Sequence, residues 1–303
     1  MRTFTFKGLL LTAVFMLLGC LSIQAANDDL ITKQITIKLD KAGTLPNKIA
    51  SSEMYKITNL KIIGEINGTD WNMIREMAGR DNRGYGTEGK LSVLDLSEAK
   101  IVKGGDSYYP GDNCYTSNDE IGEKAFTDCS RLTSLTLPVG ITSIGYDAFA
   151  YCSGLTSLTL PAGITSIDKY AFSGCSRLTS LTLPAGITSI GEFAFSYCSG
   201  LTSIYVYAEK VPRIGRYAFE GCASRKCTLY VPKGTYDNYR LSEFGYFENI
   251  VEFDATGIDK TTTSIDVEEV SRYSLNGQRL VGPTKGLNIV KYSDGSVKKV
   301  AVE

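Results

Sequence analysis

Residues 121–143 read IGEKAFTDCSRLTSLTLPVGITS, residues 144–166 read IGYDAFAYCSGLTSLTLPAGITS, and residues 167–189 read IDKYAFSGCSRLTSLTLPAGITS. Near-identity at one fixed spacing of 23 residues is typical of proteins built from stacked structural units. One such unit cannot bury its own leucine, isoleucine and phenylalanine side chains, so each is stable only against its neighbours. The sequence therefore predicts a solenoid whose coils share one hydrophobic core.

Each unit carries apolar residues in the pattern L-x-x-L-x-L, as at Leu132, Leu135 and Leu137. The last part of this pattern alternates with a period of two, which predicts a short strand. We expect the isoleucines of segment 141–144 to turn the chain. We expect Ala125 and Phe126 to lie on a short helical or 3₁₀ turn.

Less regular copies extend the repeat in both directions. A fourth copy starts at Ile190 and a fifth at Ile214, and both drift from the consensus as if leading into a cap. The same apolar template appears earlier, at 57–66 and at 91–101. The sequence thus predicts about seven coils, whose parallel strands lie about 4.8 Å apart in one sheet.

The two early coils are longer than the others. Asp70 is a candidate N-cap for an amphipathic helix that carries Trp71, Ile74 and Met77. A polar loop, Gly104–Glu120, interrupts the second early coil.

Five segments follow from these patterns. We predict a signal peptide at 1–25, an N-terminal cap with the first irregular coil at 26–90, and the solenoid with its C-terminal cap at 91–253. A linker at 254–264 and a small β module at 265–303 complete the chain. The C-terminal cap is expected to be helical around 236–247.

The N-terminus has the pattern of a secretory signal. Arg2 and Lys7 flank a basic n-region, and the apolar run that follows, from Gly8 to Leu18, is too short to span a bilayer stably. Two processing sites compete: segment 17–20 resembles a bacterial lipobox, which would place a lipid anchor on Cys20, and segment 23–26 resembles an ordinary small-residue cleavage site. Both predict export from the cytoplasm.

Composition argues against several classes of function. The chain contains no histidine, which removes the commonest general base, the usual nucleophile pairs and mixed zinc sites. A formal net charge of −1 gives no sign of the basic stripe that nucleic acid would attract. We therefore expect no enzyme, no cofactor, no metal and no nucleic-acid partner.

The cysteines recur with the repeat, at Cys129, Cys152, Cys175, Cys198 and Cys222. Parallel side chains about 4.8 Å apart hold their Cβ atoms beyond the usual disulfide range. We expect free, buried thiols, with a metal site or a redox ladder as the alternatives. Cys222 and Cys227 leave the strict repeat and could bridge in an exported protein.

The residues between the strand leucines should point away from the core, because strand side chains alternate between the two faces. They form a ladder of hydroxyl groups that ends in tyrosines. The alternative is that serine and threonine recur there only because they suit solvent-exposed strand positions, without a role in binding. Exposed tyrosines at the end of a polar field are typical interface anchors. The candidate ligand-binding residues are Ser134, Thr136, Ser157, Thr159, Ser180, Thr182, Ser203 and Tyr205, with Thr228 and Tyr230.

The opposite rim is a second candidate surface. The fourth position of the unit varies within a fixed frame, which is what a recognition surface needs. The alternative is that these side chains cover neighbouring turns. The varying residues are Lys124, Asp147, Tyr170, Phe193 and Tyr217, with Tyr146, Tyr151 and Tyr197 nearby.

Copies of the unit I-G-x-x-A-F-x-x-C-x-x-L-T-S-L-T-L-P cover residues 121–232. This unit resembles the repeat of the BspA-like leucine-rich repeat proteins, which are surface and secreted proteins of Gram-negative bacteria. The resemblance implies an α/β leucine-rich repeat solenoid and an adhesin-like protein that is secreted or lies on the cell surface. It implies binding to host matrix proteins or bacterial surface proteins, without assigning a residue-level site. A glycan-binding accessory protein for nutrient capture is the alternative.

The tail carries two hairpin signals, Asn276-Gly277 and Asp294-Gly295, between alternating apolar strands. They predict a sheet of three or four strands. The tail also resembles a short sorting domain of type IX secretion, although it is shorter than usual and ends in Glu303 rather than in a basic residue. A small accessory β domain is the alternative.

Overall fold

The structure is a computed structural model that describes residues 30–109, 111, 113–255, 269–274, 279–280, 286–292 and 297–302. The expected signal peptide, its competing cleavage sites and most of the expected linker lie outside these residues. The chain divides into two compact units, 1–255 and 256–303. No helix among the described residues has the length and apolar character needed to cross a bilayer.

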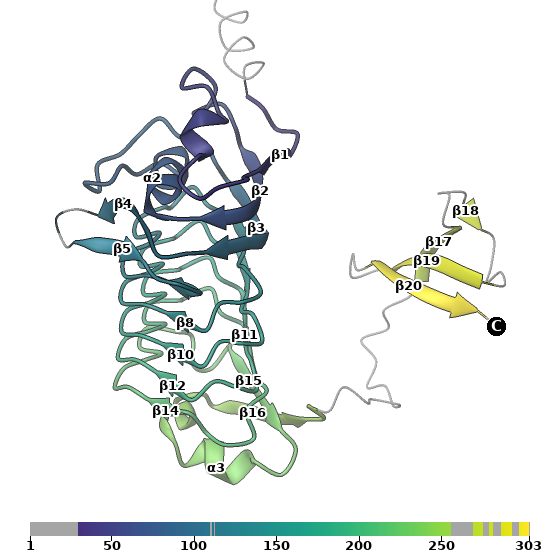
Figure 1. Cartoon of the computed structure of the whole chain (residues 1–303). Coiled ribbons are helices and arrows are strands. Elements are labelled where there is room, and N and C mark those ends of the chain that lie inside the picture. The colour runs from purple at the N-terminus through teal and green to yellow at the C-terminus, as the bar shows by residue number, and fades with distance from the viewer. Residues whose placement is uncertain are drawn as a thin grey trace, which may run out of the picture. The chain divides into compact units, whose positions relative to one another are not determined.

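A parallel sheet of nine strands forms one side of the first unit, and its coils are stacked one on another (Figure 1). The seven expected coils are present. One further strand extends the sheet at each end, where the sequence predicted only caps. The strands, in sheet order, are β1 (Ile35–Lys38), β2 (Asn59–Ile66), β3 (Val93–Ile101), β7 (Ser134–Thr136), β9 (Ser157–Thr159), β11 (Ser180–Leu183), β13 (Ser203–Val206), β15 (Thr228–Pro232) and β16 (Asn249–Phe253).

A second parallel sheet runs through the segments that were expected only to turn the chain. Its strands have two residues each, and an isoleucine of each strand faces the core. They are β6 (Glu120–Ile121), β8 (Ser143–Ile144), β10 (Ser166–Ile167), β12 (Ser189–Ile190) and β14 (Arg213–Ile214). The expected polar loop is also more ordered than predicted, because β4 (Gly104–Tyr109) and β5 (Cys114–Thr116) pair as an antiparallel hairpin within it.

A ladder of phenylalanine rings forms the centre of the core. Successive coils place near-parallel rings 5.0 to 5.4 Å apart, at Phe126, Phe149, Phe172, Phe195 and Phe219. Each of these rings is buried, and aromatic pairs at such spacings add to the free energy gained by burial alone. One coil thus completes the burial of the next.

The Ala-Phe segments lie on turns rather than on helices. The residue before each alanine has a positive φ, for example 57° at Tyr170, which interrupts a right-handed helix. The turn N–H groups bond to the following coil instead. The phenylalanine N–H groups donate from Phe126 to Ala148 O, from Phe149 to Ala171 O, from Phe172 to Ala194 O and from Phe195 to Ala218 O, each at 2.7 Å.

The N-terminal helix α2 (Gly68–Met77) begins earlier than the sequence predicted. Its N-cap is Asn67, not Asp70: the Asn67 side chain accepts a hydrogen bond from Thr69 N–H at 3.1 Å. Asp70 is the third helical residue, and its carboxylate accepts from Asn67 N–H at 2.9 Å, which completes a capping box. The prediction was wrong because it began the helix at the first periodic apolar residue and missed this reciprocal pair.

The buried Asp70 carboxylate also fastens the preceding loop, since it accepts from Gly43 N–H at 2.6 Å and from Leu45 N–H at 2.8 Å. Helix α2 then closes the first regular coil. Trp71 Nε1 and Arg75 donate to Ala125 O at 3.0 and 2.9 Å, and Tyr108 Oη of β4 donates to Glu123 O at 2.8 Å. These side chains replace the N–H groups that a preceding coil would supply.

The cysteine ladder consists of free thiols, as expected. Each thiol after the first donates to the phenylalanine carbonyl of the preceding coil, for example Cys152 Sγ to Phe126 O at 3.0 Å. Burial raises the pKa of Cys129 to about 11. Cys222 and Cys227 form no disulfide. Cys114 is buried in β5.

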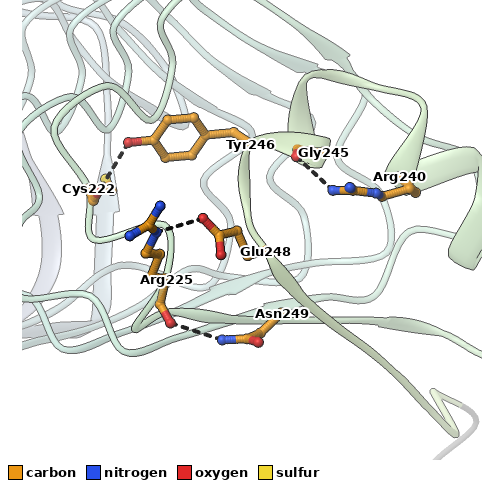
Figure 2. Close-up of polar contacts among 7 residues, drawn as sticks. All are labelled: Cys222, Arg225, Arg240, Gly245, Tyr246, Glu248 and Asn249. Atoms are coloured by element: carbon orange, nitrogen blue, oxygen red, sulfur yellow. Dashed lines mark hydrogen bonds and ion pairs between the residues drawn. The ribbon is translucent and has the colours of Figure 1, made fainter.

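The C-terminal cap is helical, as predicted, with α3 (Tyr236–Arg240) and η3 (Glu243–Tyr246) ahead of β16. Figure 2 shows how it is tied to the last coil: Tyr246 Oη donates to Cys222 O at 2.9 Å, and Arg225 Nε donates to Glu248 at 2.9 Å. Asn249 Nδ2 donates to Arg225 O at 3.0 Å.

The second unit is an antiparallel sheet of four strands, in agreement with the expected three or four. Both hairpin dipeptides lie outside the described residues. The strand order is β18 (Arg279–Leu280), β17 (Glu269–Ser274), β19 (Gly286–Tyr292) and β20 (Val297–Val302).

We predict that Asp70→Ala lowers the free energy of unfolding by about 2 to 4 kcal/mol, because three backbone donors lose one buried acceptor. Urea denaturation followed by circular dichroism measures the change. Asp106→Ala, which removes an acceptor from Thr69 Oγ1 at an exposed position, is the matched control and should cost much less. Equal costs for the two variants would contradict this role of Asp70.

Candidate binding surface

The predicted hydroxyl residues lie side by side on the outer face of the nine-stranded sheet. Sheet register aligns one row through the first position of each strand and a second row two residues later. Ser203 Oγ donates to Ser180 Oγ at 3.1 Å within the first row. The first row contains Ser134, Ser157, Ser180, Ser203 and Thr228, and the second contains Thr136, Thr159, Thr182, Tyr205 and Tyr230.

Charged residues continue the second row at its N-terminal end. Lys61 and Asp95 lie in register with Thr136, and Lys61 Nζ is 3.3 Å from Asp95 and 2.7 Å from Glu98. Hydrogen bonds to Glu98 and Asp95 raise the pKa of Lys61. Burial acts to raise the pKa of Asp95, but hydrogen bonds from Ser97 and Lys61 lower it overall. Our sequence prediction missed these residues, although the L-x-x-L-x-L template places Lys61 and Asp95 in the same slot.

The C-terminal end of the row is aromatic. The rings of Tyr205 and Tyr230 stack with centroids 4.4 Å apart, and Phe253 meets both Tyr205 and Tyr207 edge to face. Burial, and then the neighbouring Tyr230, raises the pKa of Tyr205. The prediction of exposed tyrosines at the sheet edge was wrong, because both are half-buried and β16 continues the sheet beyond them.

The second candidate surface is a second aromatic ladder. Tyr146 meets Tyr170 edge to face, while Tyr170 and Phe193 stack at 5.0 Å and Phe193 and Tyr217 at 5.2 Å. Tyr146, Tyr170 and Phe193 are half-buried, which favours the covering role for them. Tyr217, the last rung, is 58% exposed.

Tyrosine and glycine alternate at a further rim position. Tyr151 and Tyr197 have a positive φ and exposed rings, and the following coil has a glycine in the same slot. A Cβ atom on Gly174 would lie 2.8 Å from the Tyr151 ring, and one on Gly221 would lie 2.7 Å from the Tyr197 ring. The glycines therefore make room for the tyrosines of the preceding coil.

We predict that Gly174→Ala costs about 1 to 3 kcal/mol, since it adds left-handed backbone strain to a clash with Tyr151. Gly234→Ala is the matched control, because Gly234 also has a positive φ but has no atom within 4 Å of an added Cβ. In a Tyr151→Ala background the cost of Gly174→Ala should fall to that of the control. Thermal unfolding of the four variants measures this, and an unchanged cost in the Tyr151→Ala background would contradict it.

The arrangement on both surfaces suits non-covalent contact. It offers aligned hydroxyl groups, ion-paired side chains and aromatic edges. Within the described residues no group of three or more Cys, Asp or Glu side chains is placed to hold a metal ion.

Comparison with known proteins assigns the repeats to a described repeat type. Residues 114–239 match the family model of the BspA type leucine rich repeat region in 6 copies. Comparison with curated proteins gives no match. Among solved structures, the T. pallidum Leucine Rich Repeat protein (TpLRR) is 32% identical, over 38% of this chain and 52% of its own, with a TM-score of 0.35.

Two other solved structures are similar over part of their length. A leucine-rich repeat protein from Bacteroides ovatus is 28% identical, over 38% of this chain and 37% of its own, with a TM-score of 0.31. A leucine rich cell surface protein from Faecalibacterium prausnitzii A2-165 is 24% identical, over 67% of this chain and 51% of its own, with a TM-score of 0.34. The match to the repeat model and the stacked parallel sheets show that residues 114–239 form a BspA-type leucine-rich repeat region in an α/β leucine-rich repeat solenoid.

Proposed function

We propose that this chain is an adhesin-like protein, secreted by or displayed on a Gram-negative bacterium, that binds host or bacterial surface proteins through the outer face of the nine-stranded sheet. The observation that carries the proposal is the continuity of this face. Its second row changes from the charged pair Lys61 and Asp95, through the threonines, to Tyr205 and Tyr230, and each residue lies in register with the next. The first row, from Ser134 to Thr228, runs beside it and carries hydroxyl groups throughout.

The size of the face supports a macromolecular ligand. Nine strands about 4.8 Å apart give a surface on the order of 38 Å long. A stable protein interface buries about 800 Å² on each partner, with aromatic anchors near its centre and polar groups around them. The Tyr205, Tyr230 and Phe253 cluster would supply the anchors.

Glycan capture is the second candidate function. Sugars bind aromatic rings by their faces, but Tyr205 and Tyr230 turn one face of each ring toward the other at 4.4 Å. This geometry leaves less open ring surface than a row of isolated tyrosines would, so we rank a protein ligand first. Hydrolysis, a third possibility, would need a cluster of free carboxylates, whereas on the described part of this face Asp95 and Glu98 are ion-paired with Lys61 and Glu65 with Lys100.

The mode of attachment follows from residues outside the described part of the chain. Cleavage within 23–26 would release a soluble form, whereas lipid modification of Cys20 would anchor the protein to the outer membrane. Palmitate incorporation that is lost in a Cys20→Ala variant separates the two. Type IX export through the second unit is compatible with the released form.

We predict that the mature protein binds members of an array of host matrix and bacterial surface proteins. Tyr205→Ala and Tyr230→Ala should each weaken this binding by about tenfold or more, since a buried aromatic anchor contributes on the order of 2 kcal/mol. Surface plasmon resonance gives the Kd values. Tyr85→Ala, a change at an exposed tyrosine away from this face, is the matched control and should leave Kd unchanged.

Three results would count against this proposal. Binding to polysaccharide arrays alone would put glycan capture first. If Tyr85→Ala and Tyr205→Ala weakened binding equally, the ligand would not bind specifically to the sheet face. Substrate turnover that persists through repurification would indicate an enzyme.

A further inference from the structure

The ladder of hydrogen bonds between turns stops at the last regular coil. In the coils before it, Phe149, Phe172 and Phe195 each donate their N–H to the following coil at 2.7 Å. Phe219 occupies the equivalent position in the last coil, and no further repeat follows it. Within the part of the chain that the structure describes, the N–H groups of Tyr217 and Phe219 make no hydrogen bond. Phe219 is buried, and buried N–H groups are normally paired.

The C-terminal cap covers the core at this end without replacing the missing acceptors. Phe244 and Phe247 pack against the Phe219 ring with centroids 5.4 and 5.2 Å away. This contact buries the last ring of the phenylalanine ladder. It leaves the two turn N–H groups beside a hollow of about 270 Å³ that Tyr217, Phe219 and Tyr246 help to line.

A second hollow adjoins the first, and the two together are called the groove. A neighbouring hollow of about 600 Å³ shares Ile214, Glu243 and Tyr246 with the first and extends to Leu241, which is 88% exposed. Tyr246 lines both hollows, and its hydroxyl donates to Cys222 O at 2.9 Å (Figure 2). The groove is therefore preformed, which lowers the entropic cost of binding.

The charged side chains that line the groove are all acidic. Glu220 and Glu243 line the smaller hollow, and neither makes an ion pair with any residue that the structure describes. No lysine or arginine lines either hollow. Two carboxylates beside the rings of Tyr217 and Tyr246 form an environment that favours a cation and disfavours an anion.

We propose that this groove binds an extended, basic segment of a protein partner. Backbone carbonyls of the segment accept hydrogen bonds from Tyr217 and Phe219 N–H, as the carbonyls of a further coil would. An arginine or lysine side chain of the segment lies against Tyr217 and Tyr246, with its charge next to Glu220 and Glu243. The mode is the addition of one chain to an open hydrogen-bonded edge.

This site is separate from the sheet face, with which it shares no residue, so either can fail without the other. A neutral glycan would leave both carboxylates without counter-ions, and an anion would be repelled. A peptide supplies both features that the groove lacks, carbonyl acceptors and a positive charge.

Hydrogen exchange of the full chain, followed by NMR, tests the open ladder first. We expect the amide protons of Tyr217 and Phe219 to exchange on the order of 100-fold faster than those of Phe172 and Phe195, which bond to a following coil. Protection of Phe219 in the free monomer would overturn the proposal, because the donors would already be paired within the chain. Protection that grows with protein concentration would overturn it in favour of a second copy of this chain.

Peptide binding tests the chemistry of the occupant. The probe is the acetylated and amidated peptide Gly-Ala-Arg-Ala-Gly, and the matched control is the same peptide with citrulline, which has a similar shape but no charge. We expect the arginine peptide to move the Tyr217 and Phe219 amide protons downfield and to slow their exchange. Equal shifts with citrulline, or no shift at about 10 mM peptide, would overturn the proposal.

Variants then assign the charge. Glu220→Gln and Glu243→Gln should each weaken binding of the arginine peptide about fivefold or more, and the pair about tenfold or more. Glu209→Gln removes the same charge from an exposed residue that lines neither hollow, and it should leave the affinity unchanged. If Glu209→Gln weakened binding as much, the effect would come from the net charge of the protein rather than from this groove, and the proposal would be overturned. Unaltered amide spectra elsewhere in each variant verify that the fold is intact.

Discussion

The structure depends on one constraint, namely that a 23-residue coil has too little interior to bury its own apolar side chains. Each coil exposes its leucines, isoleucine and phenylalanine until the next coil covers them. The contacts that recur between coils all serve this stacking: near-parallel phenylalanine rings about 5 Å apart, cysteine thiols bonded to phenylalanine carbonyls, and turn N–H groups bonded to the following turn. The surface rows exist because this stacking holds every strand in the same register.

A stack must also end, and its two ends are closed differently. At the N-terminal end, Trp71 and Arg75 of α2 donate to Ala125 O and Tyr108 donates to Glu123 O, the carbonyls that a preceding coil would have bonded. At the C-terminal end, Phe244 and Phe247 close the core, while the N–H groups of Tyr217 and Phe219 remain available. The two ends therefore differ. Side chains bond to the turn carbonyls at the N-terminal end, whereas two turn N–H groups at the C-terminal end can accept another chain.

The near-identical repeats made the stack, the outward rows and the free cysteines predictable from sequence, because the slot of a residue in the unit determines which neighbours it meets. Features that depend on departures from the repeat were not predictable. The helix start at Asn67 rests on a reciprocal bond with Asp70, and β16 adds a strand that lacks the leucine pattern. The half-burial of Tyr205 and Tyr230 follows from that extra strand and from Phe253, which lie outside the repeat.

Removal of one whole coil tests the central claim most directly. Deletion of residues 144–166 joins Ser143 to Ile167, restores every slot of the unit and brings Asp128 beside Gly174 without a clash. We predict that this variant folds and unfolds cooperatively, with a modest loss of stability, whereas deletion of residues 144–154, about half a coil, prevents folding. Calorimetry and circular dichroism distinguish the two. Equal disruption by both deletions would contradict a structure built from interchangeable, mutually shielding coils.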